Sequence, residues 1–304
     1  MKDRLHTGTP ETRGLSPITG GKRAMVRRLR SGALSAVVHL CAILVGVFAV
    51  ALLGYILARG LPHITWELLS TAPSALRDTI GILPNLLNTF YIILLALSIA
   101  LPVGVGGAIY LNEYAPAGFF SRAVEFTTET LTGIPSIIYG LVGMMFFVQF
   151  LGMQTSLYAG ACTLVIMILP TIVRTTQEAL KTVPGSMREG AQGLGATKWY
   201  MIRTILLPSS LDGIVTGCIL AIGRIVGESA ALLFTAGIGA VVAKNIFAAF
   251  SRSGGTLAVA LYVYVFERGK FEVGFAIAAI LLLLVISVNF AAKRAGRSLK
   301  RRRS

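Results

Sequence analysis

The chain has 304 residues, of which 55% are hydrophobic and only 13% are charged. Together with a mean hydropathy of +0.75, this composition excludes an ordinary soluble domain and indicates an integral membrane protein. The formal net charge of +15 is also typical of nucleic-acid-binding proteins, but the basic residues gather at the two ends and in one loop, as membrane topology predicts. We therefore expect no nucleic-acid partner.

Six stretches are long and apolar enough to cross a bilayer as helices, because about 20 apolar residues span its hydrocarbon core. They run from Leu34 to Ala58, Thr89 to Leu111, Thr130 to Leu151, Leu157 to Val173, Gly213 to Thr235 and Val273 to Ala292. The sequence thus predicts an all-α integral membrane protein with six transmembrane helices. The first stretch is too long for a signal-peptide core, so it is expected to be a retained helix.

The six stretches divide the chain into a tail, a first helix, a core and a second tail. The basic tail 1–30 is expected to be disordered, and the first transmembrane helix occupies 31–60. A five-helix core follows at 85–292, with a polar connection at 174–212, and the chain ends in a second basic tail at 293–304.

The distribution of Lys and Arg predicts the orientation, because short basic segments are retained in the cytoplasm. Both tails are basic, and two cytoplasmic ends agree with an even number of spans. The connection 174–212 then lies in the cytoplasm, and 59–88 lies outside with only Arg59 and Arg77. The outside loop 236–272 holds four basic residues, but long loops follow the rule weakly.

Cysteine and histidine show no pattern of a metal or redox site. Cys41, Cys162 and Cys218 all fall in apolar stretches without C-x-x-C spacing, so they are expected to be reduced packing residues. The three histidines are scattered singly, which predicts no metal site.

The polar connection 174–212 is too short for a catalytic domain, and its sequence predicts two short helices. Pro184 and Gly185 should end the helix that continues from the fourth span, and Ser186 can cap a second helix that ends near Leu194. Gly195 then permits a sharp turn that a residue with a β-carbon would resist.

A further helix is expected from Thr197 to Leu206, ending before Pro208. Its apolar residues Trp199, Ile202 and Ile205 should lie on one side. The connection would therefore form a compact cytoplasmic knob.

Several residues of this connection follow one long spacing, namely Glu189, Gly190, Ala191, Gly195, Ile205, Leu207 and Pro208. The pattern resembles the EAA loop of ABC importer permeases, which reads EAA, three residues, G, nine residues and I-x-L-P. Only Gly190 departs from it, in place of the second alanine. The resemblance implies that these residues couple the chain to a cytoplasmic ATPase. The alternative is an ordinary interhelical loop with chance glycines.

The sequence contains no phosphate-binding loop of the form G-x-x-x-x-G-K-[ST]. We therefore expect a transport subunit that is not itself an enzyme and needs no cofactor, with ATP hydrolysed by a partner.

The fifth stretch contains two charged residues, Arg224 and Glu228. A charge inside a membrane helix costs at least ~2.5 kcal/mol, so each needs a partner or a function. On a helix of about 100° per residue, both share a face with Gly213 and Gly217. The opposite face is aliphatic and would suit lipid; it consists of Val215, Ile219, Ile222 and Val226.

Two interpretations of this charged face remain open. Arg224 and Glu228 are four residues apart and can form an ion pair that joins helices. Alternatively, Arg224 offers its guanidinium to a passing oxyanion while Glu228 holds it and prevents the ion from being trapped.

Three longer segments resemble a more specific group within these permeases. TGIPSIIYG at 132–140, LPTIVRTTQE at 169–178 and RIVGESAALLFTAG at 224–237 resemble the phosphate-specific transport permeases of bacteria. The resemblance covers roughly 85–239 and implies the type I ABC importer permease fold. ESAALLFTAG, together with IYLNEYAP at 109–116, is closer to the PstA type than to the PstC type, although Ala231 stands where that type has proline.

The resemblance also implies which residues meet the cargo. Arg224 and Glu228 would lie on the substrate pathway, and Arg174 would be a second basic group on the phosphate route. An arginine at the cytoplasmic end of a span can also simply extend to the lipid headgroups. Pro135 and Gly140 suggest a break or a close helix contact, either along the pathway or in packing.

The family resemblance implies the partners: a PstC-type permease, a dimer of the PstB-type ATPase and an extracytoplasmic PstS-type phosphate-binding protein, all at a bacterial cell membrane. Four alternatives remain. The chain could be a permease for another oxyanion or small nutrient, the PstC-type subunit, a membrane enzyme acting on phosphorylated lipids, or a signalling scaffold.

Overall fold

The structure is a computed structural model that describes residues 21–74, 79–116, 118–242 and 245–301. These residues are almost entirely helical and contain no β-strand beyond one isolated bridge between Ser74 and Thr79. The prediction of an all-α protein is confirmed. The chain forms two compact units, 1–55 and 56–304, and each is described by itself; residues 1–20 of the predicted disordered tail lie outside the described residues.

The first unit contains most of α1 (Gly21–Gly60). Its apolar side chains are exposed along the helix, from Leu34 to Leu53. A helix that satisfies its own backbone and exposes an apolar surface is suited to lipid. The segment Ser31–His63 is long and apolar enough to cross a membrane, so the first predicted span is confirmed in length and character.

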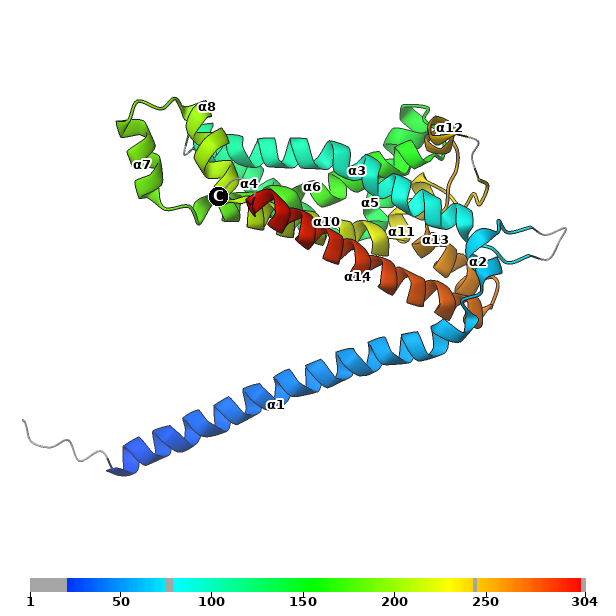
Figure 1. Ribbon diagram of the computed structural model, residues 1–304, viewed down its shortest axis with the longest axis horizontal. Helices are drawn as coiled ribbons and strands as arrows, with labels where there is room; N and C mark the ends of the chain where they lie inside the picture. The colour runs from blue at the N-terminus through cyan, green and yellow to red at the C-terminus, as the bar shows by residue number, and fades with distance from the viewer. Residues whose placement is uncertain (1–20, 75–78, 117, 243–244, 302–304) are drawn as a thin grey trace, which may run out of the picture. The chain divides into compact units, whose positions relative to one another are not determined.

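The second unit contains the remaining elements (Figure 1). In chain order they are η1 (Leu61–His63), α2 (Trp66–Ser70), α3 (Leu83–Ile109), η2 (Tyr110–Tyr114), α4 (Phe119–Thr132), α5 (Ser136–Gly143), η3 (Met144–Phe150), α6 (Leu157–Lys181), α7 (Gly185–Gly193), α8 (Lys198–Met201), η4 (Ile202–Leu206), α9 (Leu207–Ser209), α10 (Leu211–Gly227), α11 (Ala230–Thr235), α12 (Ile246–Phe250), α13 (Leu257–Tyr262), η5 (Val263–Glu267) and α14 (Phe271–Arg301). Helices α7 and α8 lie at one end of this unit, and α2 and α12 lie at the other (Figure 1).

Four helical segments can cross a membrane singly: Ser31–His63, Leu83–Tyr114, Leu157–Lys181 and Phe271–Arg294. Two further spans exist if each of two bent pairs counts as one: Phe119–Thr132 with Ser136–Phe150, and Lys198–Ser209 with Leu211–Gly227. The described residues thus hold up to six spans, as the sequence predicts.

The third and fifth stretches are not the continuous helices that the sequence predicts. Between α4 and α5 the chain bends by 105°, at Gly133, Ile134 and Pro135. Pro135 disfavours helical geometry at the residue before it and cannot donate a backbone hydrogen bond. The break expected from Pro135 is therefore present, and α5 is the second half of the broken helix.

The fifth stretch breaks near its end. Helix α10 ends at Gly227, and Glu228 adopts an extended backbone with φ −82° and ψ 118° before α11 begins at Ala230. The fifth stretch therefore consists of a long helix and a separate short one.

The loop 236–272 contains helical structure that sequence analysis missed. Helix α13 and the π-helical turn η5 form one short apolar segment, Leu257–Glu267, and residues Leu257 to Ala260 are buried. The segment is far shorter than the roughly 20 residues that define a span, so a search for spans does not detect it.

Small residues bring the helices of the second unit close together around α6. A β-carbon on Gly213 would meet the side chain of Ala179, and one on Gly217 would meet that of Thr175. The predicted small-residue face of α10 is therefore confirmed as a helix contact. The opposite face does not meet lipid as predicted, because Ile222 is only 6% exposed and Val226 only 2%.

Candidate functional site

Arg224 and Glu228 do not form the expected ion pair. Since α10 ends at Gly227, Glu228 leaves the helix and loses the four-residue geometry that pairing requires. Its carboxylate instead accepts a hydrogen bond from the backbone N–H of Ala231, at 3.0 Å. Glu228 is only 8% exposed, so it caps the first turn of α11 from a buried position.

Arg224 lies half-buried in the last turn of α10, beside the break. Among the described residues, no carboxylate forms an ion pair with it, and its guanidinium donates no hydrogen bond. A guanidinium with open donors at a helix break is suited to an oxyanion.

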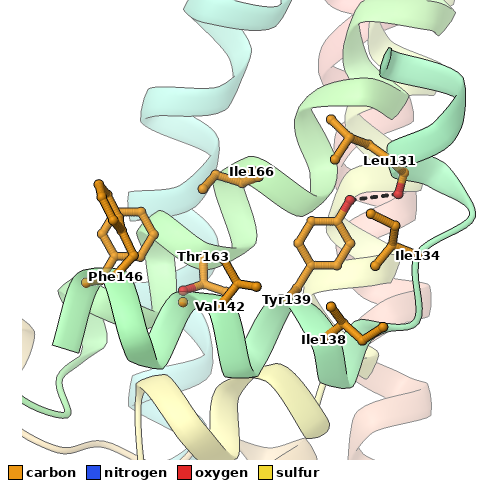
Figure 2. A pocket seen from close by; sticks show the side chains of 10 residues that line it. Leu131, Ile134, Ile138, Tyr139, Val142, Phe146, Thr163 and Ile166 are labelled. Atoms are coloured by element: carbon orange, nitrogen blue, oxygen red, sulfur yellow. Dashed lines mark hydrogen bonds between the residues drawn. The ribbon is translucent and has the colours of Figure 1, made fainter. Parts of the chain in front are cut away.

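Tyr139 was not identified by sequence analysis, although it lies in the quoted segment 132–140. Its hydroxyl donates a hydrogen bond to the carbonyl oxygen of Leu131, at 2.7 Å, so it bridges the break between α4 and α5 (Figure 2). The sequence gives no indication of this role for Tyr139, because its hydrogen bond to Leu131 depends on the bend at Pro135.

Tyr139 also lines a cavity of about 190 Å³ between α4, α5, η3 and α6 (Figure 2). Almost all of its other walls are apolar, and they include Ile134, Ile138, Phe146 and Ile166. Such a cavity does not bind an anion, because a buried charge needs polar partners.

The packing of α5 against α11 positions Tyr139 near the second break. A β-carbon on Gly140 would lie 2.8 Å from the Cα atom of Ala231, and one on Gly143 would meet Thr163 of α6. The close helix contact predicted at Gly140 is therefore present. The two broken helices meet through α5 and α11.

Arg174 lies inside α6 and forms two ion pairs. Its guanidinium lies 2.6 Å from a carboxylate oxygen of Glu129 and 3.2 Å from one of Glu178. These residues, with Lys181, line a polar cavity of about 180 Å³. Arg174 is thus neutralised by two carboxylates and is not brought together with Arg224.

The predicted coupling residues lie in the connection between α6 and α10. Glu189 and Gly190 are exposed on α7, whereas Ala191 is buried. Gly195 has φ +78°, which confirms the expected left-handed turn. Ser186 does not cap α7, because the helix begins one residue earlier, at Gly185, and Pro184 precedes it.

The second helix of the connection differs from the prediction at its end. Thr197 caps α8, and the helical segment continues through η4 and α9 to Ser209, with Pro208 inside its last turn. Proline is tolerated there because Pro208 directly follows the π-helical turn η4, which already departs from the regular hydrogen-bond pattern of an α-helix.

The apolar residues of this segment are not all buried. Ile202 is fully buried and Ile205 is partly buried, but Trp199 is 61% exposed. The buried residues form a small core, here called the loop core, which consists of Leu180, Val183, Ala191, Met201, Ile202 and Leu206. Leu207 and Ile205 pack against it, so the connection is a folded unit.

Exposed apolar side chains lie on the outer surface of this connection. Leu194 is 91% exposed, and Trp199 and Tyr200 are 61% and 60% exposed. Exposed apolar residues in a connection that also exposes the charged residue Glu189 are typical of a protein-binding surface. This surface lies at the end of the second unit that carries α7 and α8 (Figure 1).

Comparison with protein families gives one match, to the "Binding-protein-dependent transport system inner membrane component" family over residues 100–301. This range includes the breaks at Pro135 and Glu228 and the whole connection 174–212.

Two curated relatives and one solved structure illustrate the similarity. The chain is 36% identical over 214 residues to the probable ABC transporter permease protein YqgI of Bacillus subtilis, covering 70% of this chain and 73% of the relative. It is 38% identical over 192 residues to the phosphate transport system permease protein PstA of Xylella fastidiosa, covering 63% and 67%. An inward-facing structure of the MetNI methionine ABC transporter is similar with a TM-score of 0.55 and 25% identity, covering 72% of this chain and 94% of the other.

Proposed function

The chain belongs to the family of binding-protein-dependent transport system inner membrane components, and on that premise we propose that it is the PstA-type permease subunit of an ATP-driven importer of inorganic phosphate. Membership of this family establishes that the chain is a membrane permease component of an ABC importer with the type I fold. Phosphate as cargo is the proposal.

Arg224 carries the proposal. It is a half-buried guanidinium at a helix break, without an ion-pair partner among the described residues. Two parallel N–H donors match the geometry of a phosphate oxyanion. The similarity to PstA permeases supports phosphate over other oxyanions.

Glu228 and Arg174 take supporting places on the proposed pathway. Glu228 caps α11 and so fixes the break beside Arg224, and it places a negative charge near the route that favours release. Arg174 with its two carboxylate partners would contribute to the field at the cytoplasmic end of α6.

The connection 174–212 would be the coupling loop. Its exposed Glu189, Leu194 and Trp199 offer a mixed polar and apolar surface to the ATPase. The buried Ala191 and the turn at Gly195 hold the two short helices in a fixed arrangement. We place ATP hydrolysis on the partner and assign no cofactor to this chain.

An energy source is required for this cargo. Moving a divalent anion into a cell against 100 mV, negative inside, costs about 4.6 kcal/mol, at about 2.3 kcal/mol per charge. Through a passive pathway, the membrane potential would drive phosphate out of the cell. An importer driven by ATP is therefore consistent with phosphate as cargo.

The proposed assembly contains a PstC-type permease, two PstB-type ATPase subunits and an extracytoplasmic PstS-type binding protein. We place the chain in a bacterial inner membrane with both termini in the cytoplasm. In support, Gly296 near the end of α14 packs against Val215 at the start of α10, so α14 ends on the side of the coupling loop.

The test is uptake of radiolabelled phosphate into cells that lack other phosphate importers, at matched membrane abundance. Arg224→Gln should lower uptake roughly tenfold to a hundredfold, which corresponds to about 1.5–3 kcal/mol for a hydrogen bond to a charged group. Arg224→Lys should be intermediate, because it keeps the charge but loses the planar fork. Arg122→Gln, the same change on an exposed arginine of α4, serves as the control.

A pull-down of the ATPase with each variant shows whether the assembly survives. Normal uptake with Arg224→Gln would remove Arg224 from the pathway. Absence of labelled-phosphate uptake by the wild type, together with uptake of labelled sulfate or another small nutrient, would indicate a permease for another cargo.

A further inference from the structure

The segment Ile109–Pro116 (IYLNEYAP) has no assigned role, yet it contains a buried carboxylate. Glu113 lies in the π-helical turn η2, which ends the α3 span, and its side chain is only 8% exposed. A buried carboxylate is costly unless it is paired and hydrogen-bonded. Glu113 therefore must have specific partners.

The partners of Glu113 come mainly from the coupling loop. A carboxylate oxygen of Glu113 lies 3.2 Å from a guanidinium nitrogen of Arg188 in α7. The same oxygen accepts a hydrogen bond from the side-chain amide of Asn112, at 2.7 Å. The ammonium group of Lys198 donates to the backbone carbonyl of Glu113, at 2.7 Å, and lies 5.2 Å from the ring centroid of Tyr114.

Arg188 connects three segments of the chain. Besides pairing with Glu113, its guanidinium donates to the backbone carbonyl of Leu180, at 2.9 Å, and to that of Val183, at 3.4 Å. These carbonyls belong to the end of α6 and the turn that follows it, where helical acceptors lack partners within the helix. One side chain thus joins the end of α6, helix α7 and the end of α3.

An apolar contact lies beside these polar ones. Ile109, the last residue of α3, packs against the loop core. Both helices of the coupling loop are therefore attached to the end of α3, through Arg188 from α7 and Lys198 from α8.

We propose that Glu113 and Arg188 form a joint that transmits movement of the coupling loop to α3. They are positioning residues and neither touches the cargo. The carboxylate of Glu113 is largely withdrawn from water and the guanidinium of Arg188 is partly so. The pair is therefore specific in geometry, and losing Arg188 leaves an uncompensated buried charge. When an ATPase moves the coupling loop, α3 must follow through this joint.

The inference rests on the permease function proposed above but not on phosphate as the cargo. Its readout is accordingly independent of cargo: labelling of a single cysteine, Ser229→Cys at the break between α10 and α11, in the assembled transporter in lipid vesicles. Cys41, Cys162 and Cys218 are first replaced by alanine. In this background we expect a nonhydrolysable ATP analogue to change the labelling rate.

Arg188→Gln and Glu113→Gln should each reduce that nucleotide-dependent change on the order of tenfold, the scale of typical coupling between sites. ATPase binding in a pull-down should be retained, because Glu189, Leu194 and Trp199 are untouched. Arg122→Gln should leave the change intact. A variant that lost ATPase binding would show that the pair only folds the loop, and would overturn the proposal.

Restoring the link tests the joint directly. In Glu113→Cys with Arg188→Cys, a short bis-methanethiosulfonate reagent should join the two thiols through disulfide bonds, with release of methanesulfinate, and restore the nucleotide-dependent change. The change is measured at position 229 by a spin label attached beforehand through an unnatural amino acid. A thiol reductant that cleaves the disulfide bonds should abolish the change again. A double-cysteine variant that responds normally without the link would overturn the proposal. So would a failure of the link to restore the response, or a parent protein without any response to nucleotide.

If wild-type protein shows the nucleotide response but no phosphate uptake, and the pair variants lose that response, the cargo proposal fails and the joint stands. If it shows uptake and the pair variants keep the full response, the joint fails and the cargo proposal stands.

Discussion

Gly140 lies where α5 crosses α11, and the contact leaves no room for a side chain. A β-carbon there would lie 2.8 Å from the Cα atom of Ala231 and 3.2 Å from the carbonyl oxygen of Ala230. Both are backbone atoms, so rotation of a side chain cannot relieve the overlap. Gly140→Ala should lower the free energy of unfolding by about 1–3 kcal/mol, measured as thermal unfolding of the purified protein in detergent.

Gly106→Ala is the matched control for Gly140. Gly106 lies in α3, and beyond its chain neighbours and the nearby backbone of α3 no atom lies within 4 Å of its added β-carbon. This substitution should be neutral or stabilise the helix by up to about 1 kcal/mol. Equal stability of the two variants would contradict the close contact between α5 and α11.

Some residues of the site are predictable from the sequence because their signal is local. A charge at Arg224 inside an apolar stretch is expensive wherever the helix lies, and the turn at Gly195 follows from glycine itself. The pairing of Glu113 with Arg188 has no local signal, since 75 positions separate them. Only the fold brings such residues together.

Helix breaks are only partly visible in the sequence. The break before α5 carries a proline, and a break there is one of the two interpretations that Pro135 and Gly140 suggest in the sequence. The break after Gly227 has none, and the polar residues Glu228 and Ser229 there do not by themselves predict the end of a helix. The direction of the chain after Gly227 depends on the packing of α11 against α5 and α6. A hydropathy pattern does not predict such packing. The ion pair expected between Arg224 and Glu228 was wrong for this reason.

The short helix α11 depends on Glu228 for its first turn. The carboxylate accepts the N–H of Ala231, a backbone donor that lacks a partner within the helix. Glu228→Ala should therefore lower the free energy of unfolding by about 0.5–2 kcal/mol. Glu228→Gln keeps an acceptor oxygen, so it should retain most of that stability, measured in the same thermal assay.

The pair of variants separates two roles of Glu228. If the cap is its main role, Glu228→Gln should retain uptake as well as stability. If the charge is needed on the pathway, uptake should fall while the thermal midpoint holds. Equal destabilisation by both variants would contradict the cap.

The whole molecule presents a question of topology, because the number of spans is set by how the bent pairs are counted. Four helices can cross singly, and both bent pairs must cross to give six. Hydropathy and basic residues predict this arrangement from the sequence. The bends themselves and the buried segment Leu257–Glu267 can be identified only from the three-dimensional structure. An even number of spans places both ends of the chain on one side.

Single cysteines at exposed positions test that arrangement, in the background without native cysteines. Ser31 near the start of α1, Gln192 in α7 and Lys293 in α14 should all face the cytoplasm, whereas Ser251 after α12 should face outward. A membrane-impermeant maleimide on intact spheroplasts should therefore label only Ser251→Cys, and the other three should react after permeabilisation. Labelling of Lys293→Cys without permeabilisation, with Gln192→Cys protected, would mean that the segment from α10 to α14 crosses the membrane an odd number of times. One bent pair would then not be a span, and the contact of Gly296 with Val215 would need another explanation.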